Sequence, residues 1–425
     1  MTGTPDARGV GGPELSRLAR IALGHLVEPG SRELGQLVAD VGPVHALRAL
    51  QPGAPGWPRR RGAEVNADNA VHVPARLAER VRVRLGSADP FRLAEQALER
   101  AGRIGARIVT PEDEEWPYQL ADLVWLSRDA ADPIYRDTHP PHCLWVRGPW
   151  PLSAVCERSV AVVGARASTA YGDHMAGELG FGLADRGWTV VSGGAFGIDA
   201  AAHRGALAAG GPTVAVLACG VDRPYPLSHA SLFAQIAEDG LLVTEWPPGS
   251  DPHKRRFLVR NRVIAAMSRG TVMVEANVRS GARFTLNRAR DLHRHVLAVP
   301  GPATSAMSAG CHEELRVPGT VLVTGAAQVL DVVGRIGADL APPARAEESA
   351  RDQLTPLQQQ VLDGVRPRKV LTAEEIAAAA GVSTRDARRT LPGLELAGFV
   401  TATGAGYRLW RKSDPKPLVR SGSDG

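Results

Sequence analysis

The chain has 425 residues, 44% of them hydrophobic, a length that suits two to four domains of ordinary size. Lysine and arginine total 50 against 45 aspartate and glutamate, so the formal net charge of +5 identifies no anionic partner by itself. The four cysteines lack zinc-site spacing and suit a reducing compartment, and no secretory leader or membrane-length apolar run is recognisable, so we expect a cytoplasmic protein with no membrane partner.

The N-terminal part is expected to be mostly helical. Residues 1–12 are rich in Gly, Pro and Thr and are predicted to be disordered. Residues 13–105 form a predicted helical domain, and residues 106–150, which mix short apolar stretches with turn residues, are interpreted as a connecting subdomain. Within the helical domain, apolar residues recur at helical spacing over residues 14–27, 33–50, 74–85 and 91–104.

From residue 159 onward, short β-branched runs alternate with helical stretches. This alternation predicts an α/β domain at residues 151–336, built on a Rossmann-like doubly wound parallel sheet. Ligands of such sheets bind beside the carboxyl ends of the strands. The expected strands cover residues 160–163, 189–191, 213–217, 241–244, 271–274, 295–299 and 321–323, and helices are expected at 171–186, 197–209 and 283–292.

The C-terminal part is predicted to form a separate small domain. Residues 337–353 contain two adjacent prolines and several charges and are interpreted as a linker. In residues 354–412, Thr355 opens one helix, Thr372 and Glu375 form a capping box for a second, and Ser383 caps a third. Two short strands around Gly404 and Gly406 complete a winged-helix pattern. Residues 413–425 are predicted to be a polar tail.

Two glycine-containing loops follow the first two strands of the α/β domain. In the first loop, Gly164 allows a sharp turn and Arg166 could meet a phosphate near the next helix, although an ordinary turn with a surface arginine fits as well. The second loop, residues 192–199, contains three glycines and opens a helix whose first N–H groups are free to bind an anion. It is neither a dinucleotide fingerprint nor a P-loop, and its Asp199 suits a helix N-terminus without a catalytic role.

A strongly basic region lies between Lys254 and Arg294. Its 41 residues contain eleven lysines and arginines against two acidic residues, Glu275 and Asp291, so the local net charge is +9. A basic cluster can be a solvated surface, but here it adjoins both glycine loops at one sheet edge. We therefore predict that it neutralises several phosphates and binds in a salt-sensitive way. Residues 293 and 295 are histidines that are interpreted as surface or packing residues.

Motifs for catalysis are missing from the sequence. It contains no G-x-S-x-G, H-E-x-x-H or paired-carboxylate motif, and Cys311 next to His312 does not make a nucleophile–base pair. We therefore expect no catalytic residue, no metal and no cofactor.

Six motifs in order carry a family resemblance. They are the segments 163–166, 192–199, 260–262, 275–281, 298–301 and 310–312. Together they resemble the DNA-processing protein A family (DprA, also called Smf), most clearly over residues 106–335. The helical domain, similar only loosely to a sterile-alpha-motif or helix-hairpin-helix module, and the winged helix match by layout.

The resemblance implies a non-enzymatic protein that binds single-stranded DNA during natural transformation. Such proteins protect incoming strands, load the RecA recombinase on them and usually form homodimers through the Rossmann-like domain. The implied DNA-binding residues are Arg166, Ser192, Gly193, Gly194, Gly197, Lys254, Phe257, Arg260, Asn261, Arg262, Ser280 and Gly281. Phe257 could stack on a base or simply pack in the core.

The sequence also departs from the family pattern. Leu258 follows Phe257 where the family usually has proline, and no basic residue follows Tyr225-Pro226. Two other functions stay open. One is a Rossmann-like nucleotide hydrolase of the LOG phosphoribohydrolase type, although its Pro-Gly-Gly-x-Gly-Thr-x-x-Glu run is missing. The other is a transcription regulator acting through the winged helix, where Arg385, Arg388 and Arg389 could meet a groove.

Overall fold

The computed structural model describes residues 12–52, 73–126, 137–335, 351, 354–367 and 369–410. The chain divides into two compact units, residues 1–341 and residues 342–425. The predicted disorder of residues 1–12 and the predicted linker and tail fall almost entirely outside the described residues. None of the helices within the described ranges combines the length and apolarity that crossing a membrane requires.

The first unit is built on a nine-stranded sheet with the strand order β1-β2-β6-β5-β4-β3-β7-β8-β9. Strands β3 to β9 are parallel, which confirms the predicted doubly wound α/β fold. The seven parallel strands are β3 (Ser159–Val163), β4 (Thr189–Ser192), β5 (Thr213–Val216), β6 (Leu241–Thr244), β7 (Gly270–Met273), β8 (His295–Ala298) and β9 (Thr320–Leu322).

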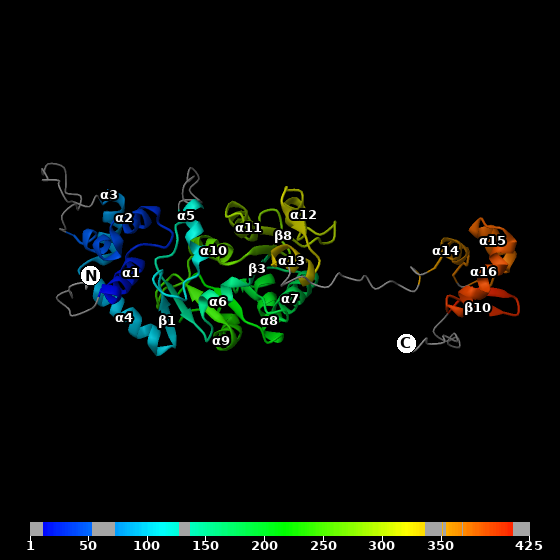
Figure 1. Cartoon of the computed structure of the whole chain (residues 1–425), viewed down its shortest axis with the longest axis horizontal. Coiled ribbons are helices and arrows are strands. Elements are labelled where there is room, and N and C mark those ends of the chain that lie inside the picture. The colour runs from blue at the N-terminus through cyan, green and yellow to red at the C-terminus, as the bar shows by residue number, and fades with distance from the viewer. Residues whose placement is uncertain are drawn as a thin grey trace. The chain divides into compact units, whose positions relative to one another are not determined.

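Helices cover both faces of this sheet, as Figure 1 shows. Alternate residues of β3 point to opposite faces: Val160 and Val162 pack in one hydrophobic core, and Ala161 and Val163 pack in another. The first core includes α7 (Ala170–Ala184), α8 (Ile198–Ala208) and α13 (Ala326–Val333). The second includes α6 (Leu152–Glu157), α10 (Lys254–Met267), α11 (Ala282–Asp291) and α12 (Ala309–Leu315).

The segment predicted to be a connecting subdomain extends the sheet instead. Its strands β1 (Ala106–Val109) and β2 (Leu144–Arg147) pair antiparallel with each other, and β2 pairs antiparallel with β6. The interpretation as a connector was wrong because its short apolar stretches are strands that find partners far along the chain. Two-residue alternation over so few residues does not reveal such pairing.

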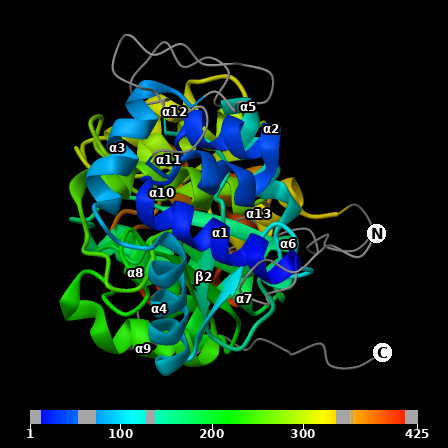
Figure 2. The same cartoon turned by 90° about the vertical axis from the view of Figure 1, so that its left-hand side faces the viewer.

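Four N-terminal helices gather beside the β1 edge (Figures 1 and 2). Their apolar faces share one hydrophobic core with β1, β2, β5, β6 and α9 (Ala230–Asp239). The helices are α1 (Gly12–Leu26), α2 (Arg32–Ala49), α3 (Ala75–Leu85) and α4 (Pro90–Arg103). All four were predicted, but α2 is interrupted at Gly42, whose backbone (φ 78°, ψ 162°) is not helical and which precedes Pro43.

The second unit contains three helices followed by a hairpin. Thr355 and Thr372 each form a capping box, with Gln358 and Glu375 respectively, and Ser383 caps the third helix, as the sequence predicted. The elements are α14 (Pro356–Asp363), α15 (Ala373–Ala380), α16 (Thr384–Leu396), β10 (Val400–Thr403) and β11 (Gly406–Leu409). This order is the one expected of a winged helix, which stays a prediction.

Candidate functional site

A pocket of about 310 Å³ lies where the strand order of the sheet reverses. From β3 the chain moves to β4, β5 and β6 on one side, and it then crosses to β7 on the other side of β3. In open α/β sheets the loops separate at such a point and leave a crevice at the carboxyl ends of the strands. The pocket, hereafter the strand-end pocket, is lined by Val163, Gly164, Arg166, Ala195, Asp199, Phe257, Leu258, Arg260, Asn261, Ile264, Ser280, Gly281, Ala282 and Thr285.

Half of the predicted binding residues line this pocket. They are Arg166, Phe257, Arg260, Asn261, Ser280 and Gly281. Lys254 is exposed at the first position of α10 and lies on the helix face of Phe257 and Asn261, because residues three, four and seven apart share a face. Ser192, Gly193, Gly194, Gly197 and Arg262 do not line the pocket, and each has another contact.

Two amides of the glycine loop after β4 are used within the protein, so that binding of a ligand by this loop stays a prediction. The Asp199 carboxylate accepts hydrogen bonds from the N–H groups of Gly193 (3.1 Å) and Ala195 (3.4 Å). Burial raises the pKa of Asp199, although Arg260 and these N–H donors oppose the shift. The chain therefore supplies its own anion to the loop, and Asp199 sits in the first turn of α8, as expected.

The glycines of this loop are needed for close packing within the protein. A side-chain Cβ at Gly193 would lie 2.4 Å from the Arg260 guanidinium. A Cβ at Gly194 would lie 2.5 Å from the Phe233 ring. Gly197 has φ 73° and precedes α8, so it occupies a conformation that few other residues adopt. The protein's own packing is therefore sufficient to explain why glycine stands at these positions.

Ser192 is likewise an internal residue. Its buried hydroxyl donates a 2.6 Å hydrogen bond to the Val162 carbonyl oxygen on the neighbouring strand. The Ser192 side chain is therefore engaged within the protein and does not line the pocket, and its contact with a ligand stays a prediction.

Arg260 is buried but contributes charge to the pocket wall. It donates hydrogen bonds to the carbonyl oxygens of Gly193 (2.9 Å) and Val216, and its Nε donates to Asn261 Oδ1 (3.1 Å). Burial lowers its pKa to about 10, while the nearby Asp199 favours the charged form. The group stays protonated at neutral pH and ties the loops after β4 and β5 to α10.

Arg262 points away from the pocket, contrary to the prediction. It forms a bidentate ion pair with Glu245, with both N–O distances 2.7 Å and side-chain exposures of 1% and 4%. A carboxylate that follows β6 in the chain thus satisfies the third residue of the Arg-Asn-Arg motif. Sequence alone could not show this pairing, because Glu245 is 17 residues away from Arg262.

Most of the predicted basic region is neutralised inside the protein. Seven of its eleven cations form ion pairs, namely Arg255, Arg256, Arg262, Arg283, Arg288, Arg290 and Arg294. Arg260 and Arg269 donate to backbone carbonyls. Among the described residues, only Lys254 and Arg279 of the eleven have no acidic or carbonyl partner. The available charge is therefore much smaller than the local +9.

Two exposed cations without a carboxylate partner among the described residues, Arg166 and Arg279, lie on or beside the strand-end pocket. Arg166 is exposed, and its guanidinium lies 5.3 Å from the centre of the Phe257 ring. Arg279 is exposed in the loop after β7, directly before the lining residue Ser280. The sequence motif contained Arg279, but nothing distinguished it from its paired neighbours. The pocket thus combines exposed cations with the buried Arg260.

Two aromatic side chains near the predicted Phe257, namely Tyr225 and Phe196, were missed as candidate binding residues. Phe257 is half-buried, with Arg166 on its face and Tyr225 against it in an edge-on arrangement (5.8 Å, 61°). Tyr225 and Phe196 remain 47% and 46% exposed. The sequence offered one signal for these two residues, because each lies in a loop that follows a central parallel strand. Exposed rings beside cations are suited to nucleic-acid bases and phosphates.

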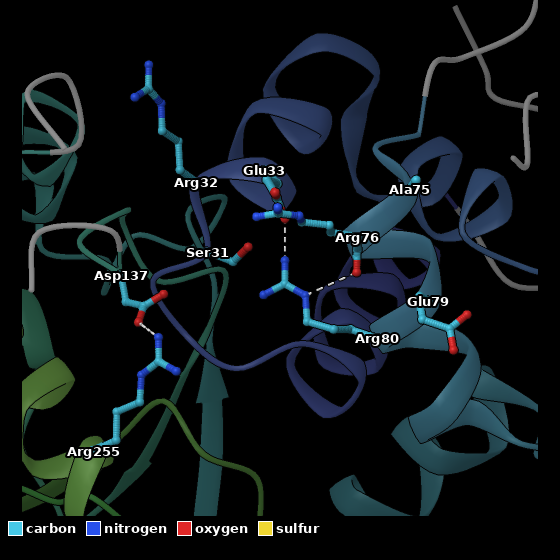
Figure 3. Close-up of a pocket in the computed structure, with 9 residues that line it drawn as sticks. All are labelled: Ser31, Arg32, Glu33, Ala75, Arg76, Glu79, Arg80, Asp137 and Arg255. Atoms are coloured by element: carbon cyan, nitrogen blue, oxygen red, sulfur yellow. Dashed lines mark hydrogen bonds and ion pairs between the residues drawn. The ribbon is translucent and has the colours of Figure 1, made fainter. Parts of the chain in front are cut away.

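A larger cavity, of about 790 Å³, lies between α2, α3 and the start of α10 (Figure 3). Its charges are mixed and mostly paired: Arg80 contacts Glu33, and Arg255 contacts Asp137. This cavity, hereafter the N-terminal cavity, is also lined by Ser31, Arg32, Ala75, Arg76 and Glu79. Its size exceeds that of the strand-end pocket, but its net positive charge is small.

Comparisons with known proteins agree on one family. The profile described as DNA recombination-mediator protein A matches residues 107–334. The putative DNA processing protein DprA of Mycobacterium tuberculosis is 42% identical over 390 residues, which cover 92% of this chain and 93% of that protein. Protein Smf of Escherichia coli is 35% identical over 279 residues, covering 65% and 74%.

A solved structure agrees with this result. The X-ray structure of DNA processing protein A from Streptococcus pneumoniae matches with a TM-score of 0.56 and 25% identity, covering 79% of this chain and 100% of that chain. The resemblance found in the motifs is confirmed, and the chain belongs to the DNA recombination-mediator protein A family, whose relatives carry the names DprA and Smf.

Proposed function

We propose that this DNA recombination mediator binds single-stranded DNA in the strand-end pocket. The observation that carries the proposal is a cluster of cations, on and beside this pocket, that have no carboxylate partner among the described residues. Arg166 and the buried Arg260 line the pocket. Arg279 directly precedes the lining residue Ser280, and Lys254 shares the face of α10 that carries the lining residues Phe257 and Asn261. Phosphates of a nucleic-acid backbone are the anions that such a group of cations contacts in series.

The aromatic rim favours a single strand over a duplex. An exposed ring gains free energy from stacking only against a base whose face is accessible. In a duplex each base is already stacked between its neighbours and paired, so Phe196 and Tyr225 would find no face to contact. A single strand can turn its bases toward the rings while its phosphates contact the cations.

Quantitative binding tests this proposal. We would measure the affinity of the full chain for an oligothymidylate and for a duplex of equal length, each at two salt concentrations. We expect tighter binding to the single strand and a loss of affinity with rising salt, since phosphate contacts release counterions. Equal or tighter binding to the duplex would reject the proposal and favour the regulator acting through the C-terminal unit.

We further propose that the protein protects incoming strands and loads RecA on them during natural transformation, as a cytoplasmic homodimer that associates through the Rossmann-like domain. Membership of the recombination-mediator family supports this role. RecA filament growth on DNA coated with single-strand binding protein would be followed with and without the chain. Faster filament growth is expected, and an unchanged rate would contradict RecA loading.

We propose that binding involves no catalysis. In the hydrolase alternative, a glutamate near the glycine loops would act on a nucleotide. Glu275 occupies such a position, but it is buried, and its carboxylate accepts hydrogen bonds from the N–H (2.9 Å) and hydroxyl (2.7 Å) groups of Thr169. It thus fixes the start of α7. Release of a base from nucleoside monophosphates by the purified chain would contradict this proposal.

A further inference from the structure

Two exposed aromatic side chains lie on the loops that follow β4 and β5. Phe196 belongs to the glycine loop after β4, next to the pocket residue Ala195. Tyr225 lies in the loop after β5 and contacts Phe257, which lines the pocket from α10. Both rings are close to half exposed, Phe196 at 46% and Tyr225 at 47%. Single exposed rings are common on protein surfaces, but these two lie beside a pocket that also has cations on its lining.

Both rings are held in place by contacts with a second ring and still remain nearly half exposed. Phe196 packs edge-on against His229, with ring centres 4.7 Å apart, and a His229 ring nitrogen lies 3.1 Å from the Gly194 carbonyl oxygen. Tyr225 is held in the same way by Phe257. A ring that is positioned before binding loses little conformational entropy when a base stacks on it.

The cations occupy the neighbouring part of the same sheet edge. Arg166 follows β3 and Arg279 follows β7, whereas the two exposed rings follow β4 and β5. Since the strands lie in the order β5-β4-β3-β7, the loops form an aromatic side and a cationic side. Arg166 above the Phe257 ring marks where the two sides meet.

We propose that Phe196 and Tyr225 are base-stacking platforms that fix how the strand crosses the pocket. The backbone phosphates run along the β3–β7 side, on Arg166 and Arg279, and the bases turn toward the β4–β5 side and stack on the two rings. This inference rests on the proposed single-strand binding and specifies the orientation of the bound strand. Stacking reads no base identity, so the protein binds strands of any sequence.

Two ligands separate stacking from charge: an oligothymidylate and an abasic oligomer with the same number of phosphates. The test variants are Phe196→Leu and Tyr225→Leu, which keep a large apolar side chain but remove the ring. We expect each to weaken oligothymidylate binding about tenfold, within the range found for base-stacking aromatics. Affinity for the abasic oligomer and the salt dependence should stay unchanged, because no phosphate contact is removed.

A spectroscopic measurement checks the same point. The fluorescence of 2-aminopurine within the oligonucleotide should be quenched by the native protein and less quenched by either variant. Leu227→Ala is the matched control, since Leu227 is 80% exposed on the Tyr225 loop and carries no ring. Its binding and quenching should equal those of the native chain, with thermal unfolding confirming that all three variants fold.

The failure of this inference differs from failure of the proposed function. If both ring variants bind the oligothymidylate as tightly as the native chain, or lose equal affinity for both ligands, the rings are not stacking platforms, while single-strand binding stands. If the native chain binds neither ligand, single-strand binding itself fails. Should Phe196→Leu not fold, Tyr225→Leu alone decides the question.

Discussion

The strand-end pocket and the N-terminal cavity show that the groups beside the cations, rather than size, distinguish the candidate site. The N-terminal cavity is more than twice as large, about 790 Å³ against 310 Å³. However, Arg80 and Arg255 in that cavity contact carboxylates (Figure 3). The N-terminal cavity also holds two arginines without an ion pair among the described residues, Arg32 and Arg76, but three carboxylates line the cavity with them. In the strand-end pocket, Arg166 has no carboxylate partner among the described residues and instead lies on an aromatic ring. A cation that the protein has not already neutralised is the one available to a phosphate.

Helix α10 contributes to both regions because successive residues of a helix point in different directions. Lys254, Phe257 and Asn261 share the face that borders the strand-end pocket. Arg255 borders the N-terminal cavity, and Arg262 is buried against Glu245. One basic segment of the sequence therefore contains three kinds of cation. Lys254 borders the strand-end pocket, Arg255 borders the N-terminal cavity, and Arg262 forms a buried ion pair.

The largest effect is expected for a cation that the protein uses internally. Arg262→Ala leaves the Glu245 carboxylate buried without a partner, which should lower the free energy of unfolding by about 3–5 kcal/mol. Urea unfolding measures this loss. The double replacement Arg262→Met with Glu245→Leu should recover much of the stability. If Arg262→Ala unfolds at the native urea concentration but binds DNA more weakly, the structural role is contradicted and Arg262 is a DNA-binding residue.

The next largest effect is expected at the strand-end pocket. Arg166→Ala should weaken single-strand binding about tenfold near 0.1 M salt and lower the slope of log affinity against log salt by about one unit. Arg255→Ala in the N-terminal cavity is the matched control, since it removes the same charge from an ion pair. Binding should change little in the control. Equal losses of affinity in both variants would contradict the proposal that the strand-end pocket, and not the N-terminal cavity, binds DNA.

Acid should loosen the contact between the N-terminal helices and the sheet. Burial tends to raise the pKa of Glu28, but hydrogen bonds from Arg256, Trp246 and Arg84 outweigh it and lower this pKa to about 2. A lowered folded-state pKa means that the stabilisation is complete above the ordinary value near 4.5 and is lost as pH falls toward 2.

The matching variant is Glu28→Gln. The Glu28 side chain is 45% exposed, so solvent screening limits the loss of unfolding free energy expected for this variant to about 1 kcal/mol at neutral pH. Below about pH 2 the difference between the native chain and the variant should vanish. Chemical unfolding followed from neutral pH to pH 2 checks this, and a constant difference over the whole range would contradict the assignment.

The smallest effects are expected for the flexible cations at the pocket rim. Lys254→Ala and Arg279→Ala should each weaken single-strand binding only about two- to threefold, because exposed side chains make well-screened phosphate contacts. Arg76→Ala, in the N-terminal cavity, is the control. Salt titrations of the three variants would show which of these residues belong to the binding surface. A loss of DNA affinity in Arg76→Ala alone would mean that the N-terminal helices, rather than the pocket rim, contact the DNA.

Several features of the site could be predicted from local sequence, and others could not. Arg166, Phe257, Asn261 and Ser280 were placed correctly at the carboxyl edge because each lies within a few residues of a strand end or on one helix face. The glycine loop was interpreted as an anion site because its shape suits one. Asp199, five residues after Gly194, accepts hydrogen bonds from two of the loop's amides, and only the folded geometry shows this.

The sequence by itself determined the doubly wound sheet, the capped helices of the C-terminal unit and the family, because hydrophobic periodicity, helix caps and ordered motifs are local properties. Tertiary structure decided that residues 106–109 and 144–147 join the sheet and which cations remain available for DNA. The physical reason is that an ion pair depends on distance in space. The carboxylates of Glu28, Asp122 and Asp137 neutralise arginines that lie more than a hundred residues away along the chain.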